Sequence, residues 1–120
     1  EIQRAFISRA IDELAKTRPT AVNLFWALEQ MRGILENETT QTVAGADLAA
    51  NIASTARRVH EEDAQMCASI GSLGATLIPD GARVLTHCNT GALATGGIGT
   101  ALGVIRTAHE SGKRVSVWAD

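Results

Sequence analysis

The stretch VLTHCNTGALATGGIGTALGVIRTAHESGKRVSVWAD, residues 84–120, decides the fold. The run ARVLTH, residues 82–87, overlaps the start of this stretch, and the run VSVWA, residues 115–119, lies near its end. Both runs predict short buried strands. The segment between them, residues 92–110, is rich in alanine and leucine, and Gly112 follows where a glycine often ends a helix. Strand, crossover helix and strand predict one βαβ unit of a parallel sheet with a right-handed crossover.

Upstream of this unit, apolar residues recur at helical spacing over the first sixteen residues, over about 20–35 and over about 46–70. Pro19 ends the first helix, and the third is expected to break or end at Gly71 and Gly74. The polar run over residues 36–42 predicts a loop or a frayed helix end. The apolar residues expected to be buried in the three helices are Ile2, Phe6, Ala10, Ile11 and Leu14; Val22, Phe25, Trp26 and Met31 or their neighbours; and Leu48, Ile52, Val59, Met66, Ile70 and Leu73.

The turn signal PDG at residues 79–81 separates the two patterns. We therefore expect a mostly α region, residues 1–79, followed by the first βαβ unit of a Rossmann-like α/β domain, residues 80–120. A single βαβ unit leaves both sheet edges unpaired, so the sheet is expected to continue beyond Asp120. A helical pattern that already includes residue 1 likewise indicates a piece of a longer chain.

Composition narrows the function classes. Hydrophobic residues make up 45% of the 120 residues and charged residues 20%, which is typical of a folded domain. A net charge of −2 and an aromatic share of 3% argue against a nucleic-acid partner. No apolar run is long enough for a membrane span, and two cysteines without a secretory segment favour a reduced, cytoplasmic protein.

Cys88 follows the first predicted strand directly, where open α/β sheets bind their ligands. The residues after it, NTGALATGG, supply backbone amides and the start of a helix, which favour anions and lower the pKa of a thiol. Two interpretations stay open at this point. Cys88 is either a reactive thiolate beside a phosphate or oxyanion, or a small buried residue that closes the strand.

Arg18 stands between two predicted helices and directly before Pro19. An arginine at the positive end of a helix dipole gains nothing as a cap. It is therefore either a solvated surface charge or a guanidinium fork held ready for a phosphate or carboxylate.

Other motifs predict structure rather than chemistry. The run GGIGTALG has leucine at position 102, where a dinucleotide fingerprint needs its third glycine, so its glycines are expected to pack helices. The acidic residues 61–63 are consecutive on a helix and are expected to form a solvated face. No metal site is predicted, because adjacent His87 and Cys88 point apart in a strand and no second ligand pair accompanies His60 and Cys67. Cys67 is expected to be core.

Five motifs carry a family resemblance: RPTAVNLFWAL (18–28), EED (61–63), IG (70–71), LTHCNTGALAT (85–95) and GTALGVI (99–105). In these motifs and their order the chain resembles the 5-methylthioribose-1-phosphate isomerases of the initiation factor 2B alpha/beta/delta-like superfamily. The resemblance implies conversion of 5-methylthioribose 1-phosphate to 5-methylthioribulose 1-phosphate in methionine salvage. It implies no metal, no nucleotide cofactor and a homodimer in the full-length protein.

The resemblance also assigns roles to residues. It implies that Cys88 is the active-site cysteine, a base or transition-state stabiliser, that Arg18 contacts the sugar phosphate and that Asn89 supports the site. The family's phosphate-gripping loop is expected before Glu1, and its catalytic aspartate, which protonates the ring oxygen, after Asp120. The 120-residue chain alone is therefore expected to be inactive.

Two alternatives to this isomerase remain. A ribose 1,5-bisphosphate isomerase shares the fold and the cysteine but normally lacks the long insertion GALATGGIGTALG. Non-catalytic regulatory subunits of the translation-initiation exchange factor share the fold and act through protein–protein contacts, but characteristically lack the cysteine in THCN.

Overall fold

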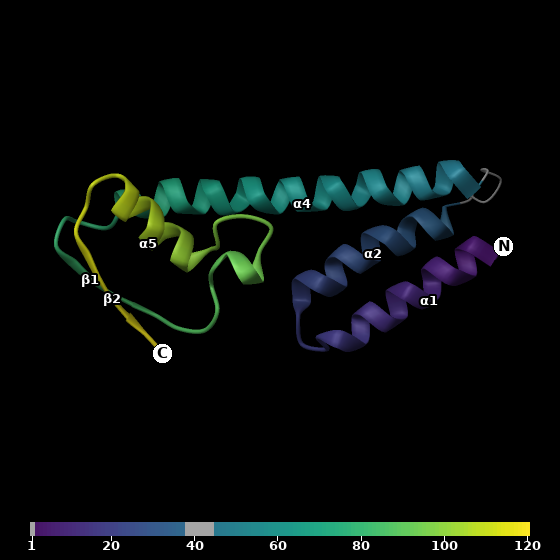
Figure 1. Cartoon of the computed structure of the whole chain (residues 1–120), viewed down its shortest axis with the longest axis horizontal. Coiled ribbons are helices and arrows are strands. Elements are labelled where there is room, and N and C mark those ends of the chain that lie inside the picture. The colour runs from purple at the N-terminus through teal and green to yellow at the C-terminus, as the bar shows by residue number, and fades with distance from the viewer. Residues whose placement is uncertain (1, 38–44) are drawn as a thin grey trace. The chain divides into compact units, whose positions relative to one another are not determined.

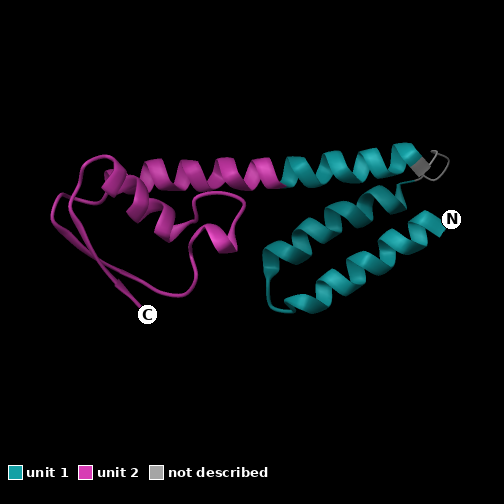
Figure 2. Cartoon of the chain, in the orientation of Figure 1, with its two compact units in different colours: residues 1–59 teal, residues 60–120 magenta. Residues whose placement is uncertain are grey.

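A computed structural model describes residues 2–37 and 45–120, and the chain divides into two compact units, residues 1–59 and 60–120 (Figure 2). The expected fold class is confirmed, since helices come first and a partial α/β unit follows (Figure 1). The elements are α1 (Ile2–Thr17), α2 (Val22–Glu36), α4 (Gly45–Thr76), β1 (Ala82–Thr86), the 3-10 helix η1 (Ala92–Ala94), α5 (Ala101–Glu110) and β2 (Val115–Ala119). The domain limits 1–79 and 80–120 stay a prediction.

In the first unit α1 and α2 form an antiparallel hairpin joined by a short turn (Figure 1). Its most buried aliphatic side chains are Ile11, Leu28 and Leu48, each at most 6% exposed. The polar run expected as a loop begins with the last residue of α2 and its C-cap, Asn37, and residues 38–42 lie outside the described part.

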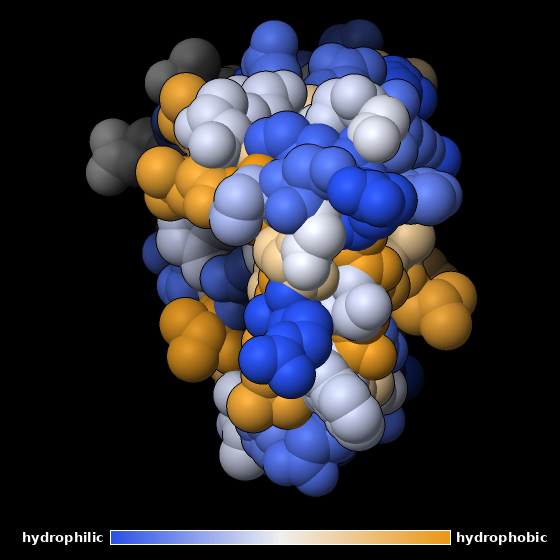
Figure 3. Space-filling view, turned by 90° about the vertical axis from the view of Figure 1, so that its left-hand side faces the viewer, coloured by the Kyte–Doolittle hydropathy of each residue, from blue (hydrophilic) through white to orange (hydrophobic). Residues whose placement is uncertain are grey.

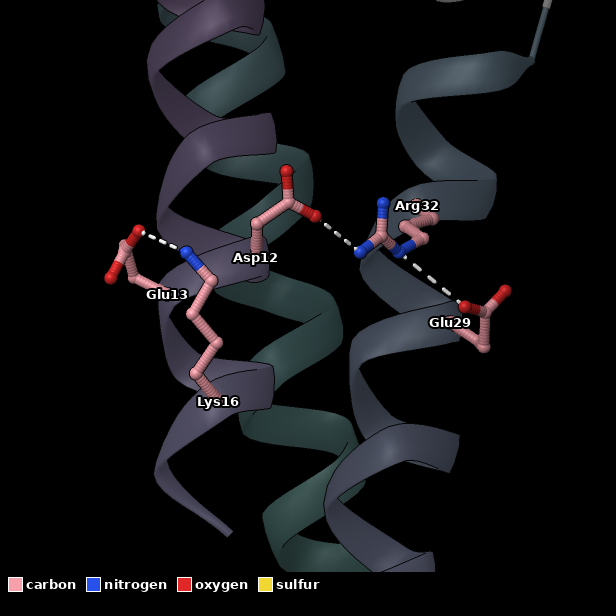
Figure 4. A network of polar contacts seen from close by, with 5 residues as sticks. All are labelled: Asp12, Glu13, Lys16, Glu29 and Arg32. Atoms are coloured by element: carbon pink, nitrogen blue, oxygen red, sulfur yellow. Dashed lines mark hydrogen bonds and ion pairs between the residues drawn. The ribbon is translucent and has the colours of Figure 1, made fainter. Parts of the chain in front are cut away.

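Arg32 connects the two helices of this hairpin. Its Nη2 lies 2.7 Å from Asp12 Oδ1 on α1, and its Nε lies 3.4 Å from Glu29 Oε1 on its own helix (Figure 4). The hydrogen bond that Arg32 donates to the Asp12 carboxylate raises the pKa of Arg32. A second pair, Lys16 with Glu13 at 2.8 Å, lies along α1. Ion pairs near the surface contribute about 0–1 kcal/mol each, so this network adds little to the stability of the hairpin.

The expected burial in the helices is only partly right. Ile11 and Leu48 are buried, whereas Phe6 is 72% exposed and Trp26 50% exposed. Leu28, a neighbour of the predicted α2 residues, is buried in their place. Helical spacing identifies an apolar face, but the tertiary contacts decide which part of that face is covered.

In the second unit α4 runs through Gly71 and Gly74 to Thr76, so the predicted break at these glycines is wrong. A Cβ on Gly74 would lie 2.5 Å from Cγ2 of Val104, and one on Gly71 would lie 2.8 Å from Oγ1 of Thr107. Both clashing side chains belong to α5. The glycines therefore let α5 approach α4 closely, and this packing offsets their low helix propensity.

The buried line of α4 in this unit runs through Cys67, Gly71 and Ala75 at steps of four residues. Cys67 is 1% exposed, which confirms it as core. By contrast Met66 and Leu73, which the spacing places in a buried stripe, are 53% and 72% exposed. The small residues face α5, and the large ones lie on the uncovered side.

The strands β1 and β2 pair in parallel from Ala82↔Val115 to Thr86↔Ala119, with α5 between them in sequence, as a βαβ unit requires. The crossover helix is shorter than expected, since it begins only at Ala101. The segment before it contains three glycines, of which Gly99 adopts φ +97°. Such residues disfavour a helix and shape a loop instead.

The two faces of this sheet differ. In β1 the residues Ala82, Val84 and Thr86 are partly covered, whereas the side chains between them are exposed. Leu85 and its register partner Trp118 are 73% and 64% exposed on the opposite face. Hydrophobic side chains stand among hydrophilic ones on the surface in Figure 3. Within the described residues the sheet is therefore covered on one face only.

A polar clamp fixes the turn between α4 and the strands. The ammonium group of Lys113 donates hydrogen bonds of 2.7 Å to the carbonyls of Ala75 and Ile78, which caps the carboxyl end of α4. Asp80 accepts two hydrogen bonds from the Arg114 guanidinium and one from its backbone amide, which hold the pKa of Asp80 below its ordinary value. The PDG turn is thereby tied to the start of β2.

The glycine packing yields a matched pair of alanine substitutions. Gly74→Ala is expected to lower the free energy of unfolding by about 1–3 kcal/mol, because its methyl group overlaps Val104. Gly33→Ala, in α2 with nothing within 4 Å of the added Cβ, is expected to raise it by about 0.5–1 kcal/mol. Urea unfolding of both variants measures the difference, and equal shifts would contradict the close approach of α5.

Candidate functional site

Cys88 lies just beyond β1, at the carboxyl end of the parallel sheet. Backbone hydrogen bonds extend the pairing past both strands: the amide of Asp120 donates to the Thr86 carbonyl, and the amide of Cys88 donates to the Asp120 carbonyl, each at 3.2 Å. The main chain of Cys88 is thus fixed by the end of β2. The end of the sheet therefore holds the backbone that carries the thiol.

The backbone of Cys88 adopts φ +66°, and in the described part of the chain it is the one residue other than glycine with positive φ. This conformation costs an L-residue about 1–2 kcal/mol. The side chain is exposed, so the interpretation of Cys88 as a small buried residue is wrong. Strained, exposed residues that the surrounding structure holds in place are concentrated at functional sites.

The residues after Cys88 fold back onto the start of α5. The side-chain oxygen of Asn89 accepts a hydrogen bond of 3.4 Å from the Gly91 amide, which forms a tight turn. Thr90 accepts two further bonds, 2.9 Å from the Thr100 amide to its carbonyl and 3.2 Å from the Leu102 amide to its hydroxyl. Cys88 and Asn89 therefore sit in one anchored loop.

The same loop lies against α4. Asp63 Oδ2 accepts a hydrogen bond of 2.6 Å from the Gly96 amide, and a Cβ on Gly97 would lie 3.0 Å from the Cα of Ala64. The expectation of a solvated acidic face is therefore wrong for Asp63, which is partly buried, and right for exposed Glu61 and Glu62. The signal in the sequence was the spacing: Asp63 precedes buried Cys67 by four residues, on the same helix face.

Arg18 is exposed in the turn between α1 and α2, where its carbonyl accepts a 3.0 Å hydrogen bond from the Ala21 amide. It belongs to the first compact unit, whereas Cys88 and Asn89 belong to the second. The guanidinium is accessible to solvent, which suits both a surface charge and a fork for an anion.

His87 and Asp120 meet at the ends of the two strands, with 3.2 Å between Nδ1 and Oδ2 and both side chains about four-fifths exposed. In residues 2–37 and 45–120 no group of three or more His, Cys, Asp or Glu side chains is arranged to hold a metal ion. The helices described here include none with the length and apolar character needed to cross a membrane.

Comparison with known proteins identifies the family of this chain. The initiation factor 2 subunit family matches residues 3–120. The chain belongs to this family. The chain is also similar to two proteins named methylthioribose-1-phosphate isomerase. The one from Heliobacterium modesticaldum is 52% identical over 97% of this chain, and the one from Geobacter sulfurreducens is 51% identical over 91%.

Two solved structures resemble the fold of this chain. Subunit delta of translation initiation factor eIF-2B from A. fulgidus covers 97% of this chain with a TM-score of 0.72 and 41% identity. The 5-methylthioribose 1-phosphate isomerase from Pyrococcus horikoshii OT3 covers 93% with a TM-score of 0.74 and 30% identity. The chain spans about a third of each relative's length, between 31% and 38%.

The contrast between the two thiols predicts their labelling. Under native conditions iodoacetamide is expected to modify Cys88 at least about tenfold faster than Cys67, because the thiolate must be reachable to react. Peptide mass spectrometry of the complete gene product measures both rates, and Cys67 should react only after denaturant is added. Equal native rates would contradict the burial of Cys67 beneath the loop.

Proposed function

We propose that the protein is a 5-methylthioribose-1-phosphate isomerase. The observation that carries the proposal is Cys88, an exposed thiol held in a left-handed conformation at the carboxyl end of a parallel sheet. Two further observations support the proposal. Proteins of that name are 52% and 51% identical to this chain in sequence. Open α/β sheets also bind their ligands at the carboxyl ends of their strands.

The reaction requires two events. The phosphate on C1 of the sugar prevents spontaneous ring opening, so an acid must protonate the ring oxygen while the C1–oxygen bond breaks. Hydrogen then moves from C2 to C1, which turns the aldose into a ketose. Cys88 serves the second event as base or transition-state stabiliser. The acid is an aspartate of the family that is expected beyond Asp120.

Arg18 and Asn89 complete the part of the site that this chain supplies. The Arg18 guanidinium binds the sugar phosphate, for which its planar fork of donors is suited. Asn89 shapes the turn after Cys88 through its bond to Gly91 and thereby supports the site.

The proposal extends to the complete protein of which this chain is a part. It is a homodimeric, cytoplasmic enzyme that uses no metal and no nucleotide cofactor. Since the chain spans about a third of its relatives' length, these 120 residues alone are expected to be inactive.

A second candidate function has an observation of its own. The 41% identity to subunit delta of eIF-2B favours a non-catalytic regulatory subunit that acts through protein contacts. The exposed Cys88 favours catalysis, because such a subunit has no use for a strained, accessible thiol. A ribose 1,5-bisphosphate isomerase is the enzymatic alternative.

Phosphorus NMR of the complete gene product with 5-methylthioribose 1-phosphate tests the reaction. Wild type is expected to form the ketose phosphate, and Cys88→Ser is expected to lower kcat by about a hundredfold or more, because a hydroxyl is a poor substitute for a thiolate. Conversion of ribose 1,5-bisphosphate alone would favour the enzymatic alternative. A folded wild type that converts neither sugar would favour the regulatory subunit.

Substitutions of Arg18 test its role as an anion fork. Arg18→Met is expected to raise KM for the sugar phosphate about tenfold or more, and Arg18→Lys to restore only part of the loss, since lysine keeps the charge but not the fork. Arg9→Met, an exposed arginine on α1, is the matched control and should leave KM within about twofold. Equal KM values for both methionine variants would make Arg18 a plain surface charge.

A further inference from the structure

We propose that Asp63 is a positioning residue for Cys88: from α4 it fixes the loop that presents the thiol. This inference rests on the proposed function for its consequence in catalysis, but not for its structural content. Its basis is the 2.6 Å hydrogen bond from the Gly96 amide to Asp63 Oδ2.

Asp63 reaches this loop from α4 and accepts a hydrogen bond from its main chain. A carboxylate acceptor makes a stronger bond than a neutral one, and partial burial protects it from competition by water. The thiol of Cys67 lies 4.0 Å from the same Oδ2, one turn further along the helix. The buried Cys67 thiol thus helps to orient the Asp63 carboxylate.

Glycines allow the loop to reach this acceptor. A Cβ on Gly96 would lie 3.0 Å from the His60 carbonyl oxygen, and one on Gly97 would lie 3.2 Å from the Cβ of Cys67. A larger residue at either position would push the loop off α4 and lengthen the bond to Asp63. The helix, the carboxylate and the glycine pair form one docking contact.

Two routes connect this contact to Cys88. The Thr95 hydroxyl, next to Gly96, donates 3.4 Å to the Gly91 carbonyl, and the Gly91 amide donates to Asn89, the neighbour of Cys88. On the other side Gly99 packs against Thr90, since a Cβ there would lie 2.5 Å from its carbonyl oxygen. These contacts hold the loop on both sides of Gly96.

Asp63 does not touch the thiol of Cys88 and takes no part in the chemistry itself. Its effect should therefore appear as misplacement of Cys88: a lower kcat with little change in KM. A displacement of about 1 Å in a reacting group is enough to cost up to about a hundredfold in rate.

Three variants of the complete gene product test this role. Asp63→Ala removes the acceptor, Asp63→Asn keeps a neutral one, and Glu61→Gln is the control on the same helix turn with an exposed carboxylate. Hydrogen exchange measures protection of the amides in residues 95–97. Iodoacetamide labelling from pH 6 to 9 measures the reactivity of Cys88, and steady-state kinetics measure kcat and KM.

We expect Asp63→Ala to speed exchange in residues 95–97 about tenfold and to change the rate of Cys88 labelling. The same variant should lower kcat about tenfold with KM within about twofold. Asp63→Asn should fall between Asp63→Ala and the control. If Asp63→Ala fails to fold, Asp63→Asn provides the test. It is expected to change amide exchange, Cys88 labelling and kcat in the same direction by a smaller amount.

Exchange and labelling equal to those of Glu61→Gln in the folded Asp63 variants would overturn the inference. Changed exchange and labelling in a protein whose wild type does not convert the sugar phosphate would leave the positioning role standing and remove the proposed function. The two hypotheses thus fail separately.

Discussion

The close approach of α5 and its preceding loop to α4 is the constraint on which the second unit depends. Three glycines make it possible: Gly71 and Gly74 on the helix, where added Cβ atoms would overlap α5, and Gly97 in the loop, where one would crowd Ala64. Burial of Cys67, Ile105 and Ala108 follows from it. The apolar surface removed from water there offsets the entropy of ordering a glycine-rich segment.

The same packing links stability to the site. Asp63 lies on the buried line of α4 and binds the loop through Gly96, while the sheet fixes Cys88 from the other side through the Asp120 carbonyl. The strain at Cys88, with its positive φ, is sustained because both neighbours of the loop are rigid elements. A thiol held in this way keeps one orientation before any ligand arrives, which is the condition for preorganised chemistry.

The candidate residues are distributed over both compact units of the chain. Cys88 and Asn89 share a loop of the second unit, whereas Arg18 occupies a helix turn of the first. Leu85 and Trp118, side by side on the uncovered sheet face, show that packing in this part of the chain is one-sided.

By itself the sequence determined the order of the elements, the parallel βαβ unit, the position of Cys88 after β1 and the family. These depend on local signals: helical spacing, the PDG turn, strand-like apolar runs and a specific motif. Only the tertiary structure decided that α4 continues through Gly71 and Gly74, that Asp63 faces inward, and that Trp26 and Leu73 stay exposed. Each of these depends on a partner segment distant in the chain, and no local pattern records which face of a helix that partner will cover.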